Sequence, residues 1–234
     1  VTALQFFAAS DDGPARLDIL APIGGPEWAG GVTVAAVRDT LSGLRADEAV
    51  LVRINSPGGF SDDGVAIHSL LRSHGGEVSV DILGGAHSAA GVIAMAADPG
   101  RLRISEGGGM LVHDAWGFAV GNASDMTAAA MMLETTSEGI ASILARRTGL
   151  ERSEVREIMR AETLLGAEDA IAQGFADSLL ETDEPVVETT ALAFRAWKER
   201  IQAGASQQFM AARSSAPITE TSMSTIPLAS LALA

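Results

Sequence analysis

The stretch VSVDILGGAHSAAGVIAMAA, residues 78–97, is the most informative part of the sequence for the fold. Its first residues, Val78 to Leu83, alternate in polarity as a strand does, and two glycines follow. Ser88 then opens a run of small and apolar residues that we interpret as a helix over residues 88–97. A strand that turns through glycines directly into a helix is typical of a βαβ unit.

The same alternation extends over most of the chain. We predict strands at residues 15–20, 49–54, 78–83, 102–104 and 110–113, and helices at residues 33–44, 63–73, 88–97, 124–148, 151–160 and 167–173. Strands that alternate with helices in this way indicate a largely parallel sheet with helices packed against it. We therefore expect an α/β fold.

The C-terminal part of the chain has a different composition. Residues 190–203 have the pattern of one amphipathic helix, and the sequence after them is rich in Ser, Thr and Ala, with Pro217 and Pro227. Such a segment has little of the periodicity of a packed domain. We therefore predict a folded domain over residues 1–182 and a C-terminal extension over residues 183–234, made of that helix and a flexible tail.

The composition excludes several classes of protein. The 234 residues include 30 acidic and 16 basic ones, and the net charge of −14 disfavours nucleic acid and anionic membranes as partners. The absence of cysteine excludes disulfides, thiol nucleophiles and Cys-ligated zinc. No apolar run reaches the ~18 residues of a membrane span. No signal peptide follows Val1, which need not be the natural start, and we expect a cytoplasmic protein.

Ser88 is the first candidate for chemistry, because it stands where a predicted strand meets the start of a helix. The free N–H groups of a helix start favour negative charge, and such a place suits a nucleophilic hydroxyl and an oxyanion. The alternative is that Ser88 only caps a buried helix. The α/β-hydrolase motif Gly-x-Ser-x-Gly is not matched, because Ala86 stands two residues before Ser88.

A glycine turn offers a second element of such a site. The sequence INSPGG, residues 54–59, follows a predicted strand and combines a rigid proline with two unhindered glycines. Glycine amides at such a turn can point into a cleft and donate hydrogen bonds to developing negative charge. A purely structural turn is the alternative.

A base that activates a serine hydroxyl would have to come from four histidines: His68, His74, His87 and His113. We interpret His68 and His74 as ordinary surface or half-buried residues, and without cysteine or an HExxH pair we expect no metal site. His87 is a poor base because neighbouring side chains usually diverge, whereas His113 ends a predicted strand. The sequence leaves three carboxylates open as the partner of this histidine: Asp114, Glu162 and Asp177.

Taken together, four blocks of sequence resemble the Clp protease proteolytic subunit family, ClpP. They are RINSPGG at residues 53–59, GAHSAA at residues 85–90, MLVHD at residues 110–114 and AETLLGAEDAIAQGFAD at residues 161–177. The resemblance covers roughly residues 15–180 and implies a ClpP/crotonase-type fold of repeated ββα units. It also implies that residues 124–148 form a long protruding handle helix that packs rings face to face; a simple core helix is the alternative.

The resemblance implies roles for individual residues. Ser88 corresponds to the nucleophile, and His113 corresponds to the general base, which later acts as an acid. The third member of the triad falls on Glu162, where the family usually has Asp. Asp114 is the reserve candidate for that role.

The family's oxyanion hole corresponds to the backbone N–H groups of Gly59 and Ala89. No metal or organic cofactor is implied. The implied activity is that of a serine endopeptidase with polypeptide substrates, assembled into homo-oligomeric rings.

Within this family, the sequence is most similar to the ClpP-like proteases with which tailed phages and prophages mature their heads. The similarity lies in VHDAWG at residues 112–117, GNASD at residues 121–125, AET at residues 161–163, GGVT at residues 30–33 and a C-terminal segment of the kind that is often scaffold sequence in that branch. We therefore expect a prohead protease that cleaves capsid or scaffold proteins in the host cytoplasm, or inside the assembling prohead.

Three alternative functions remain. A housekeeping ClpP-type subunit would work with an ATP-dependent unfoldase. A crotonase-fold acyl-CoA hydratase or isomerase would use carboxylates for proton transfer, and the scarcity of basic residues for CoA phosphates argues against it. An inactive structural subunit of a prohead would not need a serine and a histidine at the spacing of the family.

Overall fold

The computed structural model describes residues 4–8, 13–25, 31–181 and 231–233. The predicted C-terminal extension, with its helix at residues 190–203, therefore lies outside the described residues except for its last strand. The functional residues proposed above all lie within the described ranges.

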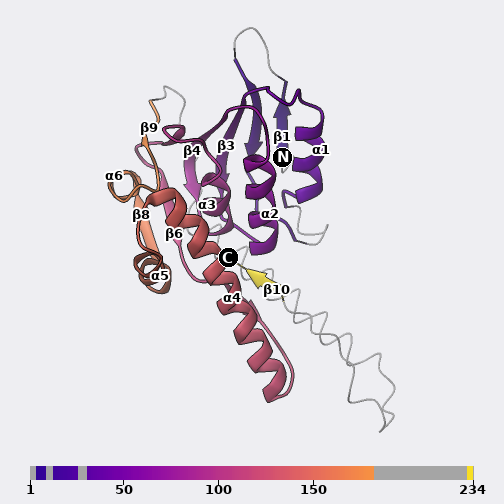
Figure 1. The fold of residues 1–234 in the computed structure, drawn as a ribbon, viewed down its shortest axis with the longest axis vertical. Helices are drawn as coiled ribbons and strands as arrows, with labels where there is room; N and C mark the ends of the chain where they lie inside the picture. The colour runs from indigo at the N-terminus through magenta and orange to yellow at the C-terminus, as the bar shows by residue number, and fades with distance from the viewer. Residues whose placement is uncertain (1–3, 9–12, 26–30, 182–230, 234) are drawn as a thin grey trace.

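Within the described residues, a sheet of eight strands forms the centre of the fold (Figure 1). Its main path consists, in spatial order, of β1 (Leu4–Phe7), β2 (Ala15–Ile19), β3 (Val50–Ser56), β4 (Val78–Ala86), β5 (Leu102–Ile104) and β9 (Ser178–Leu179). β1 is antiparallel to β2, and every later pair on this path is parallel. The prediction of an α/β fold with a largely parallel sheet is confirmed.

The six helices predicted between residues 33 and 173 are also present. They are α1 (Val34–Ser42), α2 (Ser61–Arg72), α3 (Ala89–Ala94), α4 (Ala123–Thr148), α5 (Arg152–Arg160) and α6 (Ala167–Ala172). α3 is shorter than predicted, because Met95 already caps its C-terminus. Among the described residues, no helix is long and apolar enough to cross a membrane.

Alternation along the strands gives the sheet an apolar face and a polar face. Leu17, Val52 and Val80 are fully buried and belong to the hydrophobic core, which also contains residues of α1, α2 and α3. The next residue of each strand points the other way, and in register on β2, β3, β4 and β5 these residues are Asp18, Arg53, Asp81 and Arg103. Opposite charges at paired positions favour this register.

Two further strands bring distant parts of the chain to the end of β4. β6 (Gly109–Val112) pairs with β4 at Gly85 and runs antiparallel to β8 (Thr163–Gly166). Val112 and Thr163 form the last pair of the β6–β8 ladder. The residues just beyond this pair are His113 and Glu162, so the topology places both at one end of the ladder.

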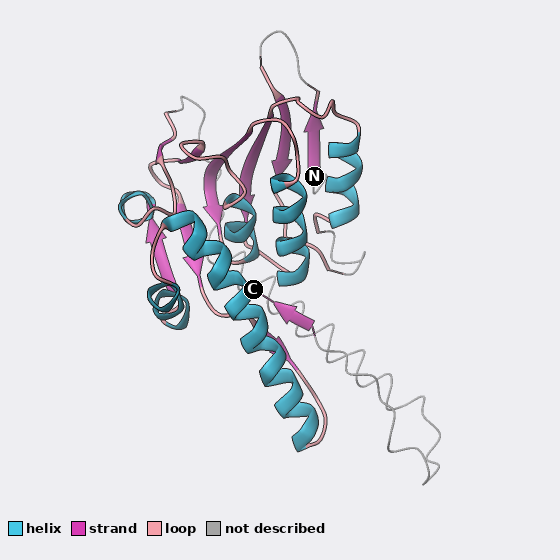
Figure 2. Cartoon of the chain, viewed as in Figure 1, coloured by secondary structure: helices cyan, strands magenta, loops and turns pink. Residues whose placement is uncertain are grey.

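The 26-residue helix α4 projects beyond the sheet (Figure 2). A capping box of Asn122 and Asp125 begins it, and Gly149 in a left-handed conformation ends it. Its buried residues lie mostly in its second half and are Ala129, Ser137, Ile140, Ala141 and Leu144. Just before α4, the strand β7 (Trp116–Phe118) pairs antiparallel with β10 (Leu231–Leu233).

Candidate active site

Ser88 lies in the sharp turn between β4 and α3. Its backbone has φ 58° and ψ −127°, a conformation that costs on the order of 1–3 kcal/mol for a residue other than glycine. The Ser88 N–H donates to the Leu111 carbonyl at 2.8 Å, which ties this turn to β6. Strained residues that the surrounding structure holds in place are concentrated at functional sites.

His113 reaches Ser88 from the end of β6. Its Nε2 lies 2.9 Å from Ser88 Oγ, and both residues are only 8% exposed. Its Nδ1 lies 2.6 Å from the main-chain carbonyl oxygen of Asp114. Because a carbonyl can only accept a hydrogen bond, Nδ1 carries the ring proton and Nε2 accepts from the Ser88 hydroxyl. This arrangement prepares a serine hydroxyl for nucleophilic attack.

Glu162, predicted as the third member of the triad, lies one position beyond the last pair of the β6–β8 ladder. It is exposed, and its backbone is left-handed, with φ 48°. Within the described part of the chain, its carboxylate takes part in no hydrogen bond or ion pair. The structure therefore places Glu162 at the same end of the ladder as His113 but shows no hydrogen bond between them.

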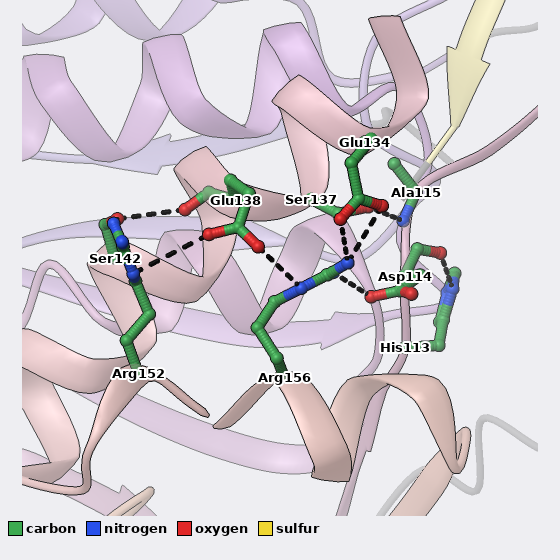
Figure 3. Close-up of polar contacts among 9 residues, drawn as sticks. All are labelled: His113, Asp114, Ala115, Glu134, Ser137, Glu138, Ser142, Arg152 and Arg156. Carbon is green, nitrogen blue, oxygen red and sulfur yellow. Dashed lines mark hydrogen bonds and ion pairs between the residues drawn. The ribbon is translucent and has the colours of Figure 1, made fainter. Parts of the chain in front are cut away.

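The other two candidate carboxylates contact arginines. The carboxylate of Asp114, the reserve candidate, pairs with Arg156, while the main-chain carbonyl of Asp114 faces His113 (Figure 3). Asp177 pairs with Arg147 at 2.6 Å. A main-chain carbonyl thus occupies the position on Nδ1 where the sequence interpretation expected a carboxylate.

The predicted oxyanion donors are the N–H groups of Gly59, which follows Gly58 in the glycine turn, and of Ala89, which follows Ser88. A parallel bridge joins Ile23 to the glycine turn: the Ile23 N–H donates to the Gly58 carbonyl at 2.8 Å, and the Phe60 N–H donates to the Ile23 carbonyl at 3.0 Å. The N–H of Gly59 therefore points away from Ile23. Among the described residues, neither this N–H nor that of Ala89 donates to a protein acceptor. Two such donors can stabilise an oxyanion.

Gly58 allows the glycine turn to approach Ser88. Its φ is +89°, and a Cβ atom at this position would lie only 2.6 Å from the Ser88 Cβ. Both the backbone conformation and the space therefore require glycine. The sequence interpretation treated Gly58 only as one of two glycines whose amides could donate, and it did not predict the close approach to Ser88.

His87 holds β6 against the turn of the nucleophile. Its Nδ1 accepts a hydrogen bond from the Leu111 N–H at 3.0 Å, while the Leu111 carbonyl accepts from the Ser88 N–H. Burial lowers the pKa of His87 below the ordinary 6.5, and the neighbouring His113 lowers it further. The neutral form that accepts this hydrogen bond is therefore favoured, and the ring contacts β6.

A small apolar pocket adjoins the serine and the histidine. Besides Ser88 and His113 it is lined by Gly91, Val92, Met110, Leu111, Val112, Ile140 and Leu144. The pocket has room for about one water molecule. No group of three or more His, Asp or Glu residues in the described ranges could hold a metal ion.

Comparison with models of protein families shows the family of this chain. The model of the Clp protease family matches residues 34–183, which is more than half of the chain and includes both Ser88 and His113. The chain belongs to the Clp protease family.

Curated members of the Clp protease family are distant relatives of this chain. It is 29% identical over 133 residues to ATP-dependent Clp protease proteolytic subunit 2 of Chlamydia trachomatis serovar D, covering 57% of this chain and 66% of the relative. It is 32% identical over 142 residues to subunit 2 of Corynebacterium jeikeium, covering 60% and 68%. It is 30% identical over 143 residues to subunit 1 of Mycolicibacterium paratuberculosis, covering 60% and 68%. The chain thus spans about two thirds of the length of these relatives.

In this member of the Clp protease family, two more residues hold the segment that follows His113. Arg156 pairs with the Asp114 carboxylate, and Ser137 Oγ accepts a hydrogen bond from the Ala115 N–H at 2.9 Å. The sequence interpretation missed both, because Arg156 stands in an ordinary amphipathic pattern of α5 and Ser137 in the middle of α4.

Proposed function

We propose that this chain is a serine endopeptidase that hydrolyses peptide bonds with Ser88 as nucleophile and His113 as general base. The observation that supports this most directly is the 2.9 Å contact between Ser88 Oγ and His113 Nε2. The strained backbone of Ser88 and the two neighbouring N–H donors add to this support.

In the proposed reaction, His113 Nε2 takes the hydroxyl proton of Ser88 while Oγ attacks the peptide carbonyl. The N–H groups of Gly59 and Ala89 stabilise the resulting oxyanion, and loss of one such donor typically costs about 3–4 kcal/mol of barrier. His113 then gives the proton to the leaving amine. Water, activated by the same histidine, releases the acyl group from Ser88.

Glu162 is our proposed third member of the triad. The resemblance to the family and the end of the β6–β8 ladder support this assignment, because the position after Val112 lies beside the position before Thr163. In this proposal the Glu162 carboxylate stabilises the imidazolium that forms during attack. Asp114 remains the reserve candidate for the third member of the triad. Its main-chain carbonyl accepts a hydrogen bond from His113 Nδ1.

We further propose a ClpP/crotonase-type fold of repeated ββα units, with α4 as the handle helix of a homo-oligomeric ring. The family supports this, as do the exposed side chains of Met126, Met131 and Met132 on α4. The division into a protease domain over residues 1–182 and an extension over residues 183–234 also remains our proposal, as does a location in the host cytoplasm.

For substrates, we propose capsid or scaffold proteins of a phage head. The support is the similarity of residues 112–117 and 121–125 to the phage branch. A housekeeping role with an ATP-dependent unfoldase is the second candidate. It is favoured by the relatives, which are named ATP-dependent Clp protease proteolytic subunits.

The test is labelling with a serine-reactive fluorophosphonate, read by intact mass on the wild-type chain and on the variants Ser88→Ala and His113→Ala. We expect one adduct on the wild type and none on either variant, because the reagent requires an activated serine. Absence of labelling on a folded, assembled wild type would contradict the peptidase proposal. That outcome would favour a crotonase-type acyl-CoA enzyme or an inactive structural subunit.

A further inference from the structure

Arg156 lies at the centre of a cluster that joins α4, α5 and the segment after β6 (Figure 3). It is only 3% exposed. Its Nη1 pairs with Asp114, its Nη2 lies 2.9 and 3.0 Å from the two carboxylate oxygens of Glu134, and its Nε lies 3.0 Å from Glu138. Every nitrogen of the guanidinium therefore faces a carboxylate, two from α4 and one from the residue that follows His113.

The cluster fixes the backbone on which His113 depends. The carboxylate of Asp114 is held by Arg156, and the carbonyl of the same residue accepts from His113 Nδ1. The next residue, Ala115, donates its N–H to Ser137 Oγ on α4. The two residues after His113 are thus held by Arg156 of α5 and Ser137 of α4.

This arrangement has a chemical consequence for the histidine. The Asp114 carbonyl keeps the ring proton on Nδ1, so that Nε2 presents its lone pair to the Ser88 hydroxyl. If this carbonyl moves away, the other tautomer becomes accessible, with a proton on Nε2 that cannot accept from Ser88. Fixing the position of Asp114 therefore selects the active tautomer.

Packing alone gives little reason for an arginine at this position. Taking a guanidinium out of water is costly, and a buried ion pair is often no more stable than apolar side chains of similar volume. The side chain of Glu134 is 59% exposed and that of Asp114 is 32% exposed, so water can solvate both without Arg156. A role of Arg156 in orienting Asp114 accounts for the buried guanidinium.

We infer that Arg156 is a positioning residue for the active site: by holding Asp114 it keeps His113 in the tautomer and orientation that serve Ser88. This inference rests on the proposed function, since it assigns a role within the Ser88–His113 mechanism. Arg156 itself touches neither the serine nor the histidine in the hydrogen bonds described above.

The test compares Arg156→Met with Arg152→Met. Arg152 lies on the same helix and also reaches α4, through Glu138 and Ser142, but has no contact with Asp114 among the hydrogen bonds and ion pairs of the described residues. The measurement is the rate of fluorophosphonate labelling of Ser88 over a range of pH. We expect Arg156→Met to lower the limiting rate at alkaline pH at least tenfold, because a misplaced base slows attack. Arg152→Met should stay within twofold of the wild type.

Asp114→Ala provides the second variant, and it keeps the measurement informative if Arg156→Met fails to fold. It keeps the main-chain carbonyl but removes the carboxylate that Arg156 holds. Because residue 114 is then no longer held in place, we expect a loss of labelling rate similar to that of Arg156→Met. In the double variant the two losses should not add, because both act through the same contact. A rate of Asp114→Ala equal to that of the wild type, or fully additive losses, would overturn the inference.

A spectroscopic measurement separates orientation from general destabilisation. In protein labelled with ¹⁵N-histidine at alkaline pH, the neutral imidazole of His113, assigned with His113→Ala, should show a proton on Nδ1. Arg156→Met should shift it toward a mixture of tautomers, whereas Arg152→Met should not. A wild type that fails to be labelled at Ser88 contradicts the proposed function. Normal labelling and an unchanged tautomer in Arg156→Met contradict only the present inference.

Discussion

At the scale of single residues, the candidate site depends on backbone conformations that few side chains tolerate. Ser88 adopts φ 58° in the turn after β4, and Gly58 approaches it with φ +89° from the turn after β3. These two backbone conformations allow the two turns to pack closely against each other. The glycine turn comes this close to Ser88 only because no Cβ stands at position 58.

Gly58→Ala should reduce Ser88 labelling about 100-fold, since displacing the turn by about 1 Å is enough for such a loss. The new Cβ would lie 2.6 Å from the Ser88 Cβ, so the turn must shift. Labelling rates measured on folded protein test this prediction.

The matched control is Gly100→Ala. Gly100 also has a positive φ, of +78°, but nothing lies within 4 Å of the added Cβ. This variant should lose about 1 kcal/mol of stability from backbone strain and keep its labelling rate. Equal labelling of the two variants would show that the approach of Gly58 to Ser88 has no part in the reaction.

The stability of the protein should depend on pH through His68. Its pKa is lowered from 6.5 to about 4, mainly by burial and further by Arg72 and Arg146. Below pH 6.5 the unfolded chain binds this proton while the folded chain does not, so the free energy of unfolding should fall as the pH falls from 6.5 to about 4. The slope of the free energy of unfolding against pH should be at most about 1.4 kcal/mol per pH unit. Above pH 6.5, His68 should not contribute to the pH dependence of stability.

Urea unfolding of the wild type and of His68→Leu measures this contribution. The variant lacks the titrating group, so its stability should change less between neutral pH and about pH 4. Identical pH dependence in both proteins would contradict the assignment to His68.

At the scale of elements, the sequence predicted the long helix α4 and also the short strands β5 and β6, but it missed β7, β8 and β9. α4 was predicted over residues 124–148 and is found at Ala123–Thr148, because its pattern extends over many turns. β8 has only four residues, among which Leu164 is exposed and Leu165 buried, so its two leucines give no clear pattern. β7 and β9 are shorter still, and their pairing depends on partners far away in the sequence.

The capping box of α4 leads to a prediction at this scale. Asn122 accepts hydrogen bonds from the N–H groups of Ser124 and Asp125 at 2.8 and 3.2 Å. Asn122→Ala should weaken the first turn by about 1 kcal/mol and speed its amide exchange, while the labelling of Ser88 should not change. Ser124→Ala keeps the cap and is the control; equally fast exchange in the two variants would contradict the prediction.

At the scale of the whole molecule, the candidate site combines segments that local patterns cannot connect. The turns with Gly59 and Ser88, and the strand before His113, were visible because each combines a recognisable turn or strand end with a chemically useful group. The contact of Arg156 with Asp114 spans 42 residues and was not visible. On the sequence, Arg156 resembles the solvent-exposed charges around it on α5, and only the packing of α5 against α4 buries it.

The proposed function includes the assembly of several copies of the chain into a ring. Met131 on α4 is 67% exposed, and we expect it to be covered by another copy of the chain in the ring. Native mass spectrometry should show several copies for the wild type and smaller species for Met131→Asp. Ala35→Asp, on the exposed side of α1, is the control with the same added charge. A wild type that remains monomeric would contradict the proposed ring.

The anchoring of the histidine segment to α4 has a mechanical consequence. α4 packs around Ile140 in its second half, while Ala123 lies about 26 Å from that point along the axis and Glu134 about 9 Å from it. If the helix tilts as a rigid rod about Ile140, a sideways movement of about 3 Å at the far tip becomes about 1 Å at Glu134. That is the scale on which the alignment of a base with its nucleophile is lost. A contact that displaces the N-terminal end of α4 would therefore move Glu134, and through Arg156 and Asp114 it would change the orientation of the His113 imidazole.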